Sequence, residues 1–442
     1  MGSIPITRSG PKRQHIVAAT IGNALEFYDF LIYALFAIQI GHAFFPTSTA
    51  YGSLMLSLAT FGAGFATRPI GSIVLGIYAD RVGRKPAMLL CLVMIGVSIT
   101  AMALIPPYEK IGMAAPILAV IARLVQGFSL GGEIGCNTAF LAEVARPQHR
   151  GQVVSWQGAS QLIAFASGSL VGVALSAIMP SSLLDQYGWR IALLLGAATV
   201  PFGLWLRTRL PETLHAGEEA IAPASPAPRG MVLARRHFRV MVLGLVALSC
   251  ATIATYTLTY VGTYAQHTLR LSAHVGFVSE LTSYAVSIPL VVLGGRLSDH
   301  YGRRRINVWS NLAFLIAIYP VFAWIAAAPS EAKLVAGTTL LSALSFCRLG
   351  PLLAGLAEAL PCAIRSSGLG TVYSLAIAAF GGTTQLVITW LIHLTGSSIA
   401  PAWYLVGATA VGQIAYMLLP ETAPMLLESQ GYRAAEVLLP PG

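Results

Sequence analysis

Apolar stretches long enough to cross a lipid bilayer follow one another along almost the whole of this 442-residue chain. A transmembrane α-helix needs about 20 consecutive, mostly apolar residues. By that measure the sequence predicts twelve spans, over residues 16–42, 51–78, 86–106, 115–143, 153–179, 188–207, 239–265, 274–297, 305–327, 333–359, 367–393 and 399–419. Only 10% of the residues are charged, whereas soluble domains carry about 25%. We therefore expect an all-α membrane protein, and a large soluble protein with buried helices is excluded.

The basic residues are distributed unevenly between the two predicted sides of the membrane. If the N-terminus is cytoplasmic, 20 of the 27 Lys and Arg residues fall in cytoplasmic segments and four on the opposite side. Such a bias is typical of cytoplasmic loops, so we expect both termini in the cytoplasm. It also explains the net charge of +10 without a nucleic-acid partner. The other three, Arg68, Arg123 and Arg348, lie inside predicted spans.

The second half of the sequence repeats motifs of the first. The stretch GIYADRVGRK at 76–85 returns as GRLSDHYGRR at 295–304, and LPET at 210–213 returns at 419–422. Each copy falls at the cytoplasmic end of corresponding predicted spans. Matched motifs in the same order indicate that the chain is built from two similar units.

A single long linker separates these units. Residues 209–238 are rich in Pro and Ala and carry charges. They divide the chain into an N-terminal six-helix half, residues 1–208, and a C-terminal six-helix half, residues 239–442. In transporters built from two parallel repeats, the substrate site lies between the halves near the middle of the membrane. We expect the same arrangement here.

Several motifs together resemble a known family. GIYADRVGRK, its second copy and the two PET sequences resemble the major facilitator superfamily. Other stretches resemble its metabolite–proton symporters, and among these the bacterial citrate and tricarballylate permeases: GNALEFYDF (22–30), TRPIGS (67–72), RLVQGFSLGGEIG (123–135), SWQGASQ (155–161), SLAIAAFGG (374–382) and LTGSSIAPAWYL (394–405). The resemblance implies a fold of twelve helices in the bacterial inner membrane. It also implies proton-coupled uptake of a citrate-like tricarboxylate by alternating access.

Two carboxylates, Glu26 and Asp29, lie near the middle of the first predicted span. A charged carboxylate at the centre of a bilayer costs roughly 2.5–3.5 kcal/mol on insertion scales, unless water or a partner receives it. Since residues three apart share one side of a helix, both carboxylates are expected to face a cavity. We predict that at least one, with Asp29 preferred, binds the coupling proton. The alternative is that Glu26 is a structural ion-pair partner or caps backbone.

The fourth predicted span carries a polar stripe. At 100° per residue, Arg123, Gln126, Glu133 and Asn137 fall within an arc of about 80°. This face is expected to line a cavity, with Arg123 as a substrate or gate cation and Glu133 as a second proton site. A structural Arg–Glu network between the spans remains an equal alternative.

The two other intramembrane arginines are also substrate-site candidates. A planar guanidinium binds a carboxylate through two parallel hydrogen bonds, which suits Arg348 for a tricarboxylate. A structural ion pair with a carboxylate of the first half is the alternative for Arg348. Arg68, in TRPIGS, has either a substrate role or a structural one.

Amides and hydroxyls on spans five and seven complete the predicted site. Gln157, with Ser160, and Gln161 share one face of span five, and Tyr256 and Tyr260 share one of span seven. Such groups can bind the oxygens of a carboxylate substrate. For the tyrosines, helix packing or anchoring at the membrane interface is the alternative.

The repeated cytoplasmic motifs are expected to form a gate. Ion pairs between them can form when the cytoplasmic side is closed and break on opening. The residues are Asp80, Arg84, Glu143, Arg150, Asp299, Arg303, Glu358 and Arg365, which Glu212 and Glu421 could join. The alternative is that the arginines only set the topology.

The sequence contains no convincing catalytic or metal-binding motif. The GxSxG match at 127–131 lies within a spanning helix, where close packing of small residues is the better interpretation. The five cysteines show no metal or disulfide spacing. We expect no cofactor, no metal, no enzymatic reaction and a monomer in the bilayer. Its ligands are a small organic acid anion and protons, with a dicarboxylate, 2-oxoglutarate, shikimate or a betaine as alternative substrates.

Overall fold

The computed structural model describes residues 20–21, 23–24, 27–28, 31–82, 84–131, 138, 141–142, 145–208 and 237–429. Its helices are α2 (Ala37–Phe44), α3 (Ala50–Ala66), α4 (Arg68–Val82), α5 (Arg84–Leu104), α6 (Tyr108–Ile111), α7 (Ala114–Leu130), η1 (Pro147–His149), α9 (Arg150–Ile178), α10 (Ser181–Leu183), η2 (Leu184–Gly188), α11 (Trp189–Thr208), α13 (Phe238–Thr259), α14 (Val261–Thr263), η3 (Tyr264–Thr268), α15 (Ala273–Tyr301), α16 (Arg303–Ala327), α17 (Glu331–Cys347), α18 (Leu349–Ala359), α19 (Cys362–Phe380), α20 (Thr383–Thr395), α21 (Ala400–Leu418) and α22 (Pro424–Ser429). This part of the chain is helical and contains no strand.

Eight helical stretches among these residues are long and apolar enough to cross a membrane. They are Ala50–Leu75, Pro147–Ile178, Ser181–Trp205, Phe238–Thr268, Ala273–Tyr301, Arg303–Ala327, Glu331–Ala359 and Gly368–Thr395. Two shorter apolar helices cover Leu89–Leu104 and Ala114–Leu130. The all-helical prediction is confirmed, and the total of twelve spans stays a prediction because several positions of the first and fourth spans lie outside the described residues.

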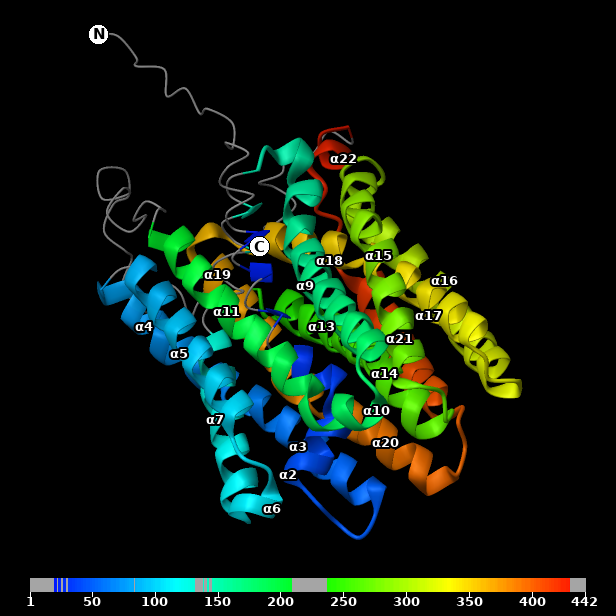
Figure 1. Cartoon of the computed structure of the whole chain (residues 1–442). Helices are drawn as coiled ribbons and strands as arrows, with labels where there is room; N and C mark the ends of the chain where they lie inside the picture. Colours follow the sequence, from blue (N-terminus) through cyan, green and yellow to red (C-terminus); the bar gives the residue numbers. More distant parts are fainter. Residues whose placement is uncertain are drawn as a thin grey trace.

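The helices form two groups, which we call the N-terminal segment (residues 20–208) and the C-terminal segment (residues 237–429). In Figure 1, α6, α10 and the loop between α2 and α3 lie at one end of the molecule, which we call the α6 end. The opposite end, with α22 and the start of α9, is called the α22 end. The linker predicted at 209–238 lies almost wholly outside the described residues.

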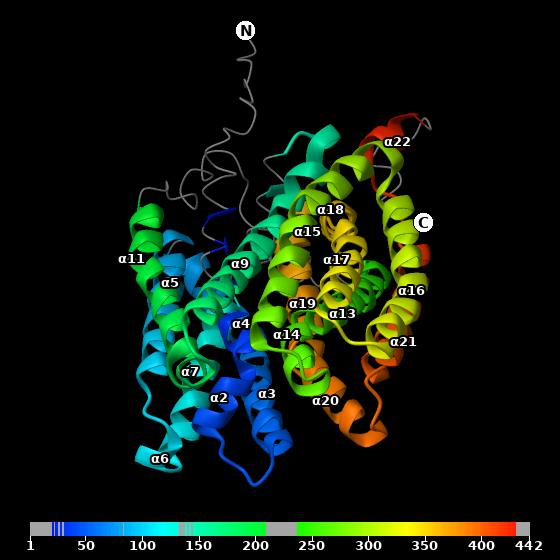
Figure 2. The same cartoon turned by 45° about the vertical axis from the view of Figure 1, so that its right-hand side comes forward.

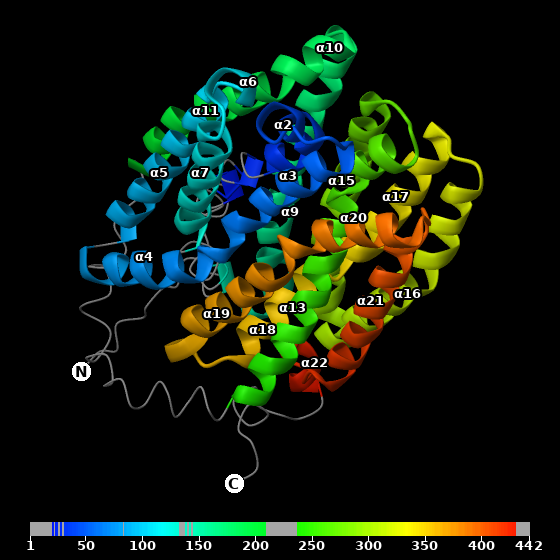
Figure 3. The same cartoon turned by 90° about the horizontal axis from the view of Figure 1, so that it is seen from below.

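The segments contact each other in two regions. Figure 2 shows α9 and α15 side by side along most of their length. On the other side of the bundle, α3 and α4 pack against α19 and α20, as seen from below in Figure 3. The region between these two contacts is therefore bordered by helices of both segments.

Several membrane-depth helices are interrupted near this shared region. α3 ends where α4 begins, at Thr67, and α17 ends where α18 begins, at Arg348. The Thr67 hydroxyl donates to the carbonyls of Gly64 (3.3 Å) and Leu124 (2.8 Å). Irregular backbone at membrane depth is tolerated where protein surrounds it. The breaks place polar side chains inside the bundle.

Glycines bring α3, α4 and α7 into close contact. A Cβ at Gly127 would lie 1.5 Å from the Gly64 carbonyl oxygen, and one at Gly71 would lie 1.8 Å from that of Phe128. The Ser129 hydroxyl donates to the Cys91 carbonyl at 2.7 Å. The GxSxG match is thus a helix-packing surface, as expected from its place in a spanning helix.

Adding one methyl group at this surface is expected to prevent folding. Gly127→Ala would force α3 and α7 apart, because backbone and not a flexible side chain occupies the space. The expected result is loss of most monodisperse protein after detergent extraction, measured by size-exclusion chromatography.

Gly407→Ala is the matched control, since a Cβ at this helical glycine meets no atom within 4 Å. It should leave the yield unchanged or slightly raised, because alanine is the better helix former. Normal yield of Gly127→Ala would contradict the packing argument.

Candidate functional site

Buried arginines and aromatic rings meet where the two segments join. We call the following group the central cluster: Tyr33, Phe61, Phe65, Arg68, Arg123, Gln161, Tyr256 and Tyr373. The first six come from the N-terminal segment, and the two last tyrosines come from α13 and α19 of the C-terminal segment. All eight side chains are buried.

Arg123 lies on α7 among aromatic rings. Its guanidinium carbon is 4.6 Å from the ring centroid of Tyr33 and 5.1 Å from that of Phe61. It also donates a hydrogen bond to the side-chain oxygen of Gln126. A small pocket beside it is lined by Tyr33, Ser98, Ile99, Met102, Ala122, Arg123, Gln126 and Leu193. Arg123 and Gln126, which the sequence placed on one helix face, are thus hydrogen-bonded to each other.

Arg68 begins α4, directly after the break at Thr67. Its guanidinium carbon is 4.7 Å from the ring centroid of Phe65. Phe65 in turn packs edge-to-face on Tyr256 of the C-terminal segment, with 5.3 Å between centroids. Phe61, which lies under the Arg123 guanidinium, packs on the same Tyr256 ring with 6.1 Å between centroids. The Arg68 side chain therefore lies on the face of the N-terminal segment that meets α13.

Amide groups of α9 extend the polar surface. Gln161 donates to the Tyr373 hydroxyl at 3.3 Å, which is a hydrogen bond between the segments. Gln157 donates to the Asn23 side-chain oxygen at 3.2 Å, and Asn23 donates to Ser160 at 2.7 Å. Asn23 precedes Glu26 by three residues in GNALEFYDF. The predicted face of span five thus contacts the stretch that carries the two acids.

Together these groups favour an anionic ligand. Arg68 and Arg123 lie over two neighbouring rings, Phe65 and Phe61, whose centroids are 5.2 Å apart. Two positive charges in one buried, low-dielectric region are unfavourable, and an anion bound there would offset that cost. Tyrosine hydroxyls and glutamine amides can donate to carboxylate oxygens. Among the described residues, no group of three or more His, Cys, Asp or Glu side chains could hold a metal ion.

A second polar network joins the segments at the α22 end. Asp299 accepts hydrogen bonds from the backbone N–H groups of Gly151 (2.8 Å) and Gln152 (3.0 Å) in the first turn of α9. A carboxylate in that position stabilises the N-terminus of a helix. Here the carboxylate comes from the other segment, so separating the segments at this end breaks both bonds.

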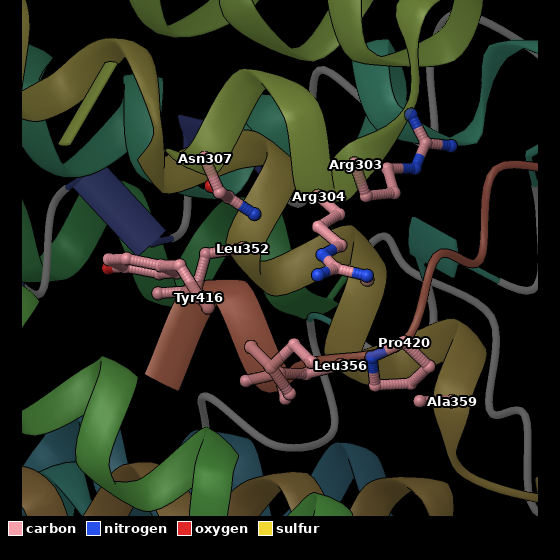
Figure 4. A pocket seen from close by; sticks show the side chains of 10 residues that line it. Arg303, Arg304, Asn307, Leu352, Leu356, Ala359, Tyr416 and Pro420 are labelled. Carbon is pink, nitrogen blue, oxygen red and sulfur yellow. The ribbon is translucent and has the colours of Figure 1, made fainter. Parts of the chain in front are cut away.

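Arg303 organises the rest of this network. It forms ion pairs with Asp299 (2.7 Å) and Glu358 (3.1 Å), and Glu358 lies 3.7 Å from Arg150 of the N-terminal segment. A small pocket beside Arg303, shown in Figure 4, is lined also by Arg304, Asn307, Leu352, Leu356 and Tyr416. Arg365 instead donates to the Ala357 carbonyl at 2.6 Å. The structure thus brings four of the predicted gate residues together, whereas the side chains of Asp80, Arg84 and Glu143 lie outside its description.

Arg348 lies away from the central cluster. Its guanidinium donates to the Ser345 carbonyl (3.2 Å) and lies over the rings of Phe314 (5.1 Å) and Tyr416 (5.7 Å). These partners all belong to the C-terminal segment. Tyr260 likewise faces its own segment, where its hydroxyl accepts a hydrogen bond from Thr389 at 2.8 Å. The geometry therefore does not favour substrate contact by either residue, and that contact stays a prediction.

The predicted proton sites Glu26, Asp29 and Glu133 lie outside the described residues, together with Asn137. The central cluster also contains residues that the sequence analysis did not predict, namely Tyr33, Tyr373 and the aromatic residues of α3. Tyr373 is the tyrosine just before the SLAIAAFGG stretch. Its position directly before a motif that resembles the citrate permeases is the sequence feature that could have identified it.

Comparisons with known proteins agree with this architecture. The family model of the Major Facilitator Superfamily matches residues 19–347. The chain is 35% identical over 426 residues to a citrate-proton symporter of Klebsiella pneumoniae, covering 96% of this chain and 95% of that protein. It is 29% identical over 445 residues to a proline/betaine transporter of Escherichia coli K12, covering 98% and 88%.

Among solved structures, the fold is similar to that of the proton:xylose symporter XylE bound to 6-bromo-6-deoxy-D-glucose. The TM-score is 0.75 over 96% of this chain and 97% of that one. The sequences are 16% identical, so this likeness concerns the fold alone.

Proposed function

Because this chain belongs to the major facilitator superfamily, we propose that it is a secondary active transporter for a citrate-like tricarboxylate. Inward movement of protons drives uptake across a bacterial inner membrane, with twelve spans in two six-helix halves and both termini in the cytoplasm. The α22 end then faces the cytoplasm. The protein works as a monomer without a cofactor and catalyses no chemical reaction.

The observation that carries the substrate class is the pair of buried arginines in the central cluster. Arg68 and Arg123 lie over the rings of Phe65 and Phe61, and both rings pack edge-to-face on Tyr256 of the C-terminal segment. A tricarboxylate offers several carboxylates to two guanidinium groups, and each can accept two parallel hydrogen bonds. The 35% identity to a citrate-proton symporter supports citrate as the first substrate to test.

A betaine is the second candidate, because aromatic rings gather in the same place and one relative is a proline/betaine transporter. Aromatic rings bind quaternary ammonium groups through cation–π contacts. In this chain, however, the rings of Tyr33 and Phe65 already hold guanidinium groups, at 4.6 and 4.7 Å. A cationic ligand would therefore meet two positive charges, which favours the acid over the betaine.

In alternating access, the contacts between the segments at one end of the molecule would break while those at the opposite end form. At the α22 end the candidates are Arg150, Asp299, Arg303 and Glu358, with their bonds across the segments. Their repeat counterparts Asp80, Arg84 and Glu143 complete the proposed gate. Coupling requires that protons and substrate be bound in the same closed state. We assign the coupling proton to Asp29, with Glu26 and Glu133 as further candidates.

The test is uptake of labelled citrate into proteoliposomes with an alkaline interior. The wild-type protein should accumulate citrate, and Asp29→Asn should abolish gradient-driven accumulation while citrate exchange without a gradient continues. Asp185→Asn is the matched control, because this exposed residue only accepts a hydrogen bond from Gln39, which asparagine can also accept.

The substrate and the coupling can fail separately. If a dicarboxylate, 2-oxoglutarate, shikimate or a betaine is taken up and citrate is not, the tricarboxylate assignment is wrong. The assignment as a secondary active transporter still holds in that case. If accumulation follows a sodium gradient and not a pH gradient, the proposed proton coupling is wrong.

A further inference from the structure

The segments also meet at the α6 end, opposite the ion-pair network. Tyr51 of α3 stacks on His393 of α20 with ring centroids 3.9 Å apart. Phe36 packs against Phe277 of α15 at 5.1 Å. Gln39 donates to the side-chain oxygen of Gln266 at 3.3 Å. We call these contacts the α6-end seal, because they join the two segments at this end.

A buried carboxylate, Glu280, bridges the two segments just inside this seal. It lies on α15, about 10 Å along the helix from Ala273 at the α6 end, and is 2% exposed. The backbone N–H of Gly262 donates to its Oε1 at 2.9 Å. The hydroxyl of Ser169, on α9 of the N-terminal segment, donates to its Oε2 at 3.3 Å. One of its two partners thus comes from each segment.

No cation among the described residues forms an ion pair with Glu280. α9 carries one titratable residue, Arg150 at its far end, and α14 carries none. Other titratable groups near this end include Tyr51 and His393 in the seal itself and Asp185 beside Gln39. They also include Tyr264 and His267 on η3, Arg270 after it, His274 and Tyr284 on α15, and Glu331 and Lys333 at the start of α17. The Tyr264 hydroxyl donates to the Ser398 carbonyl, and Tyr284 donates to Thr259.

A carboxylate with two neutral donors and no cation is costly to bury in the charged form. Protonation removes that cost. A proton on Oε2 would donate to Ser169, since a serine hydroxyl both donates and accepts. The closed seal therefore suits the neutral acid, with the proton held between the two segments.

We propose that Glu280 is a proton-binding site that controls the α6-end seal. The charge pattern predicts that this end faces outside, so opening exposes Glu280 to external water and separates it from Ser169. The carboxyl then releases its proton to that water. Closing again requires that Glu280 take a proton up from the same side. Acid outside thus favours the closed seal, and alkaline conditions favour the open one.

This role is separate from that of the coupling proton. Because Glu280 exchanges its proton with the outer side only, it adds no proton to the transport stoichiometry. It makes seal closure depend on external pH, in addition to any dependence on the gradient. The inference rests on the proposed alternation of the two openings. Its test needs no substrate, so it can fail independently of the citrate assignment.

The test is a distance measurement between the segments at the α6 end. Spin labels are placed on cysteines at Lys110 and Ala332, exposed residues of α6 and α17, in a variant whose five native cysteines are replaced. In the wild type, raising the pH from about 5 to about 9, a range that includes the titration of a buried carboxyl, should shift the distances toward longer values. Glu280→Gln, which mimics the neutral acid, should keep the short distances throughout.

Glu331→Gln is the matched control, because this carboxylate is exposed at the same end, and it should retain the wild-type shift. Glu280→Asp keeps a titratable group and should restore a pH-dependent shift. If Glu280→Gln does not fold, Glu280→Met provides a second neutral side chain of similar length. A pH-dependent shift of wild-type size in either neutral variant would overturn the proposal, and so would its absence in the wild type.

Discussion

Replacement of Arg68 by alanine is expected to lower the affinity for citrate by about 30-fold to several thousand-fold, because truncating one partner of a buried charge pair costs roughly 2–5 kcal/mol. The guanidinium lies over Phe65 in the central cluster, and the Phe65 ring packs on Tyr256 across the segment interface. Without it, a bound carboxylate would lose its planar fork of donors. The measurement is citrate binding to detergent-solubilised protein by isothermal titration calorimetry.

Two comparisons make the Arg68 result interpretable. Arg68→Lys keeps the charge but loses the fork, so an intermediate loss of affinity is expected. Arg146→Ala removes an exposed arginine from the same segment and should bind citrate as the wild type does. If Arg68→Ala binds citrate normally while Arg348→Ala does not, the substrate site lies inside the C-terminal segment and not at the segment interface.

The second large effect is expected at the α22 end. Asp299→Ala removes the acceptor of the Gly151 and Gln152 backbone bonds, which join the two segments. Hydrogen bonds to a charged group contribute about 1.5–3 kcal/mol each. We expect the state closed at this end to lose about 3–6 kcal/mol, which lowers its population relative to the open state at least about 100-fold. Accumulation of citrate should then fail, because the transporter cannot close this end to return outward.

Distances at the α22 end provide the measurement. Spin labels at Gln148 and Arg305, exposed residues of the two segments, should move apart in Asp299→Ala. Glu421→Ala is the matched control: Glu421 accepts from the backbone N–H groups of Arg303 and Arg304, which lie in its own segment. It should weaken stability without changing the distance. An unchanged distance in Asp299→Ala would remove this network from the gate.

Apolar span length and local motifs were enough to predict the all-helical fold and the family. Both are properties of a continuous stretch of sequence, so no knowledge of packing is needed. That Asp299, Arg303 and Glu358 belong to one charged group was predicted for a related reason, although the sequence did not say which of them pair. The repeated motifs lie at the same ends of corresponding spans in the two halves, so their charged groups are expected at the same end of the molecule. The packing of the GxSxG glycines also followed from local sequence, since small residues in a spanning helix allow close approach of backbones.

The roles of the three intramembrane arginines could not be separated in this way. In the sequence each is a lone cation within an apolar span. In the structure, Arg68 and Arg123 lie over Phe65 and Phe61, whose rings pack on Tyr256 of the other segment. Arg348 instead lies over Phe314 and Tyr416 of its own segment. Helical periodicity tells which residues share a face of a helix. It does not tell which neighbour that face meets, because this depends on how each helix is rotated in the bundle.

Span length and repeated motifs thus establish the membrane class and predict the two-fold architecture and the charged groups of a gate. Which polar groups meet across the two segments follows from the packing of the helices. Tyr373 and Gln161 come together from positions 212 residues apart, and Ser169 and Glu280 from positions 111 apart. Such contacts arise from the packing of whole helices, and no local pattern in the chain encodes them.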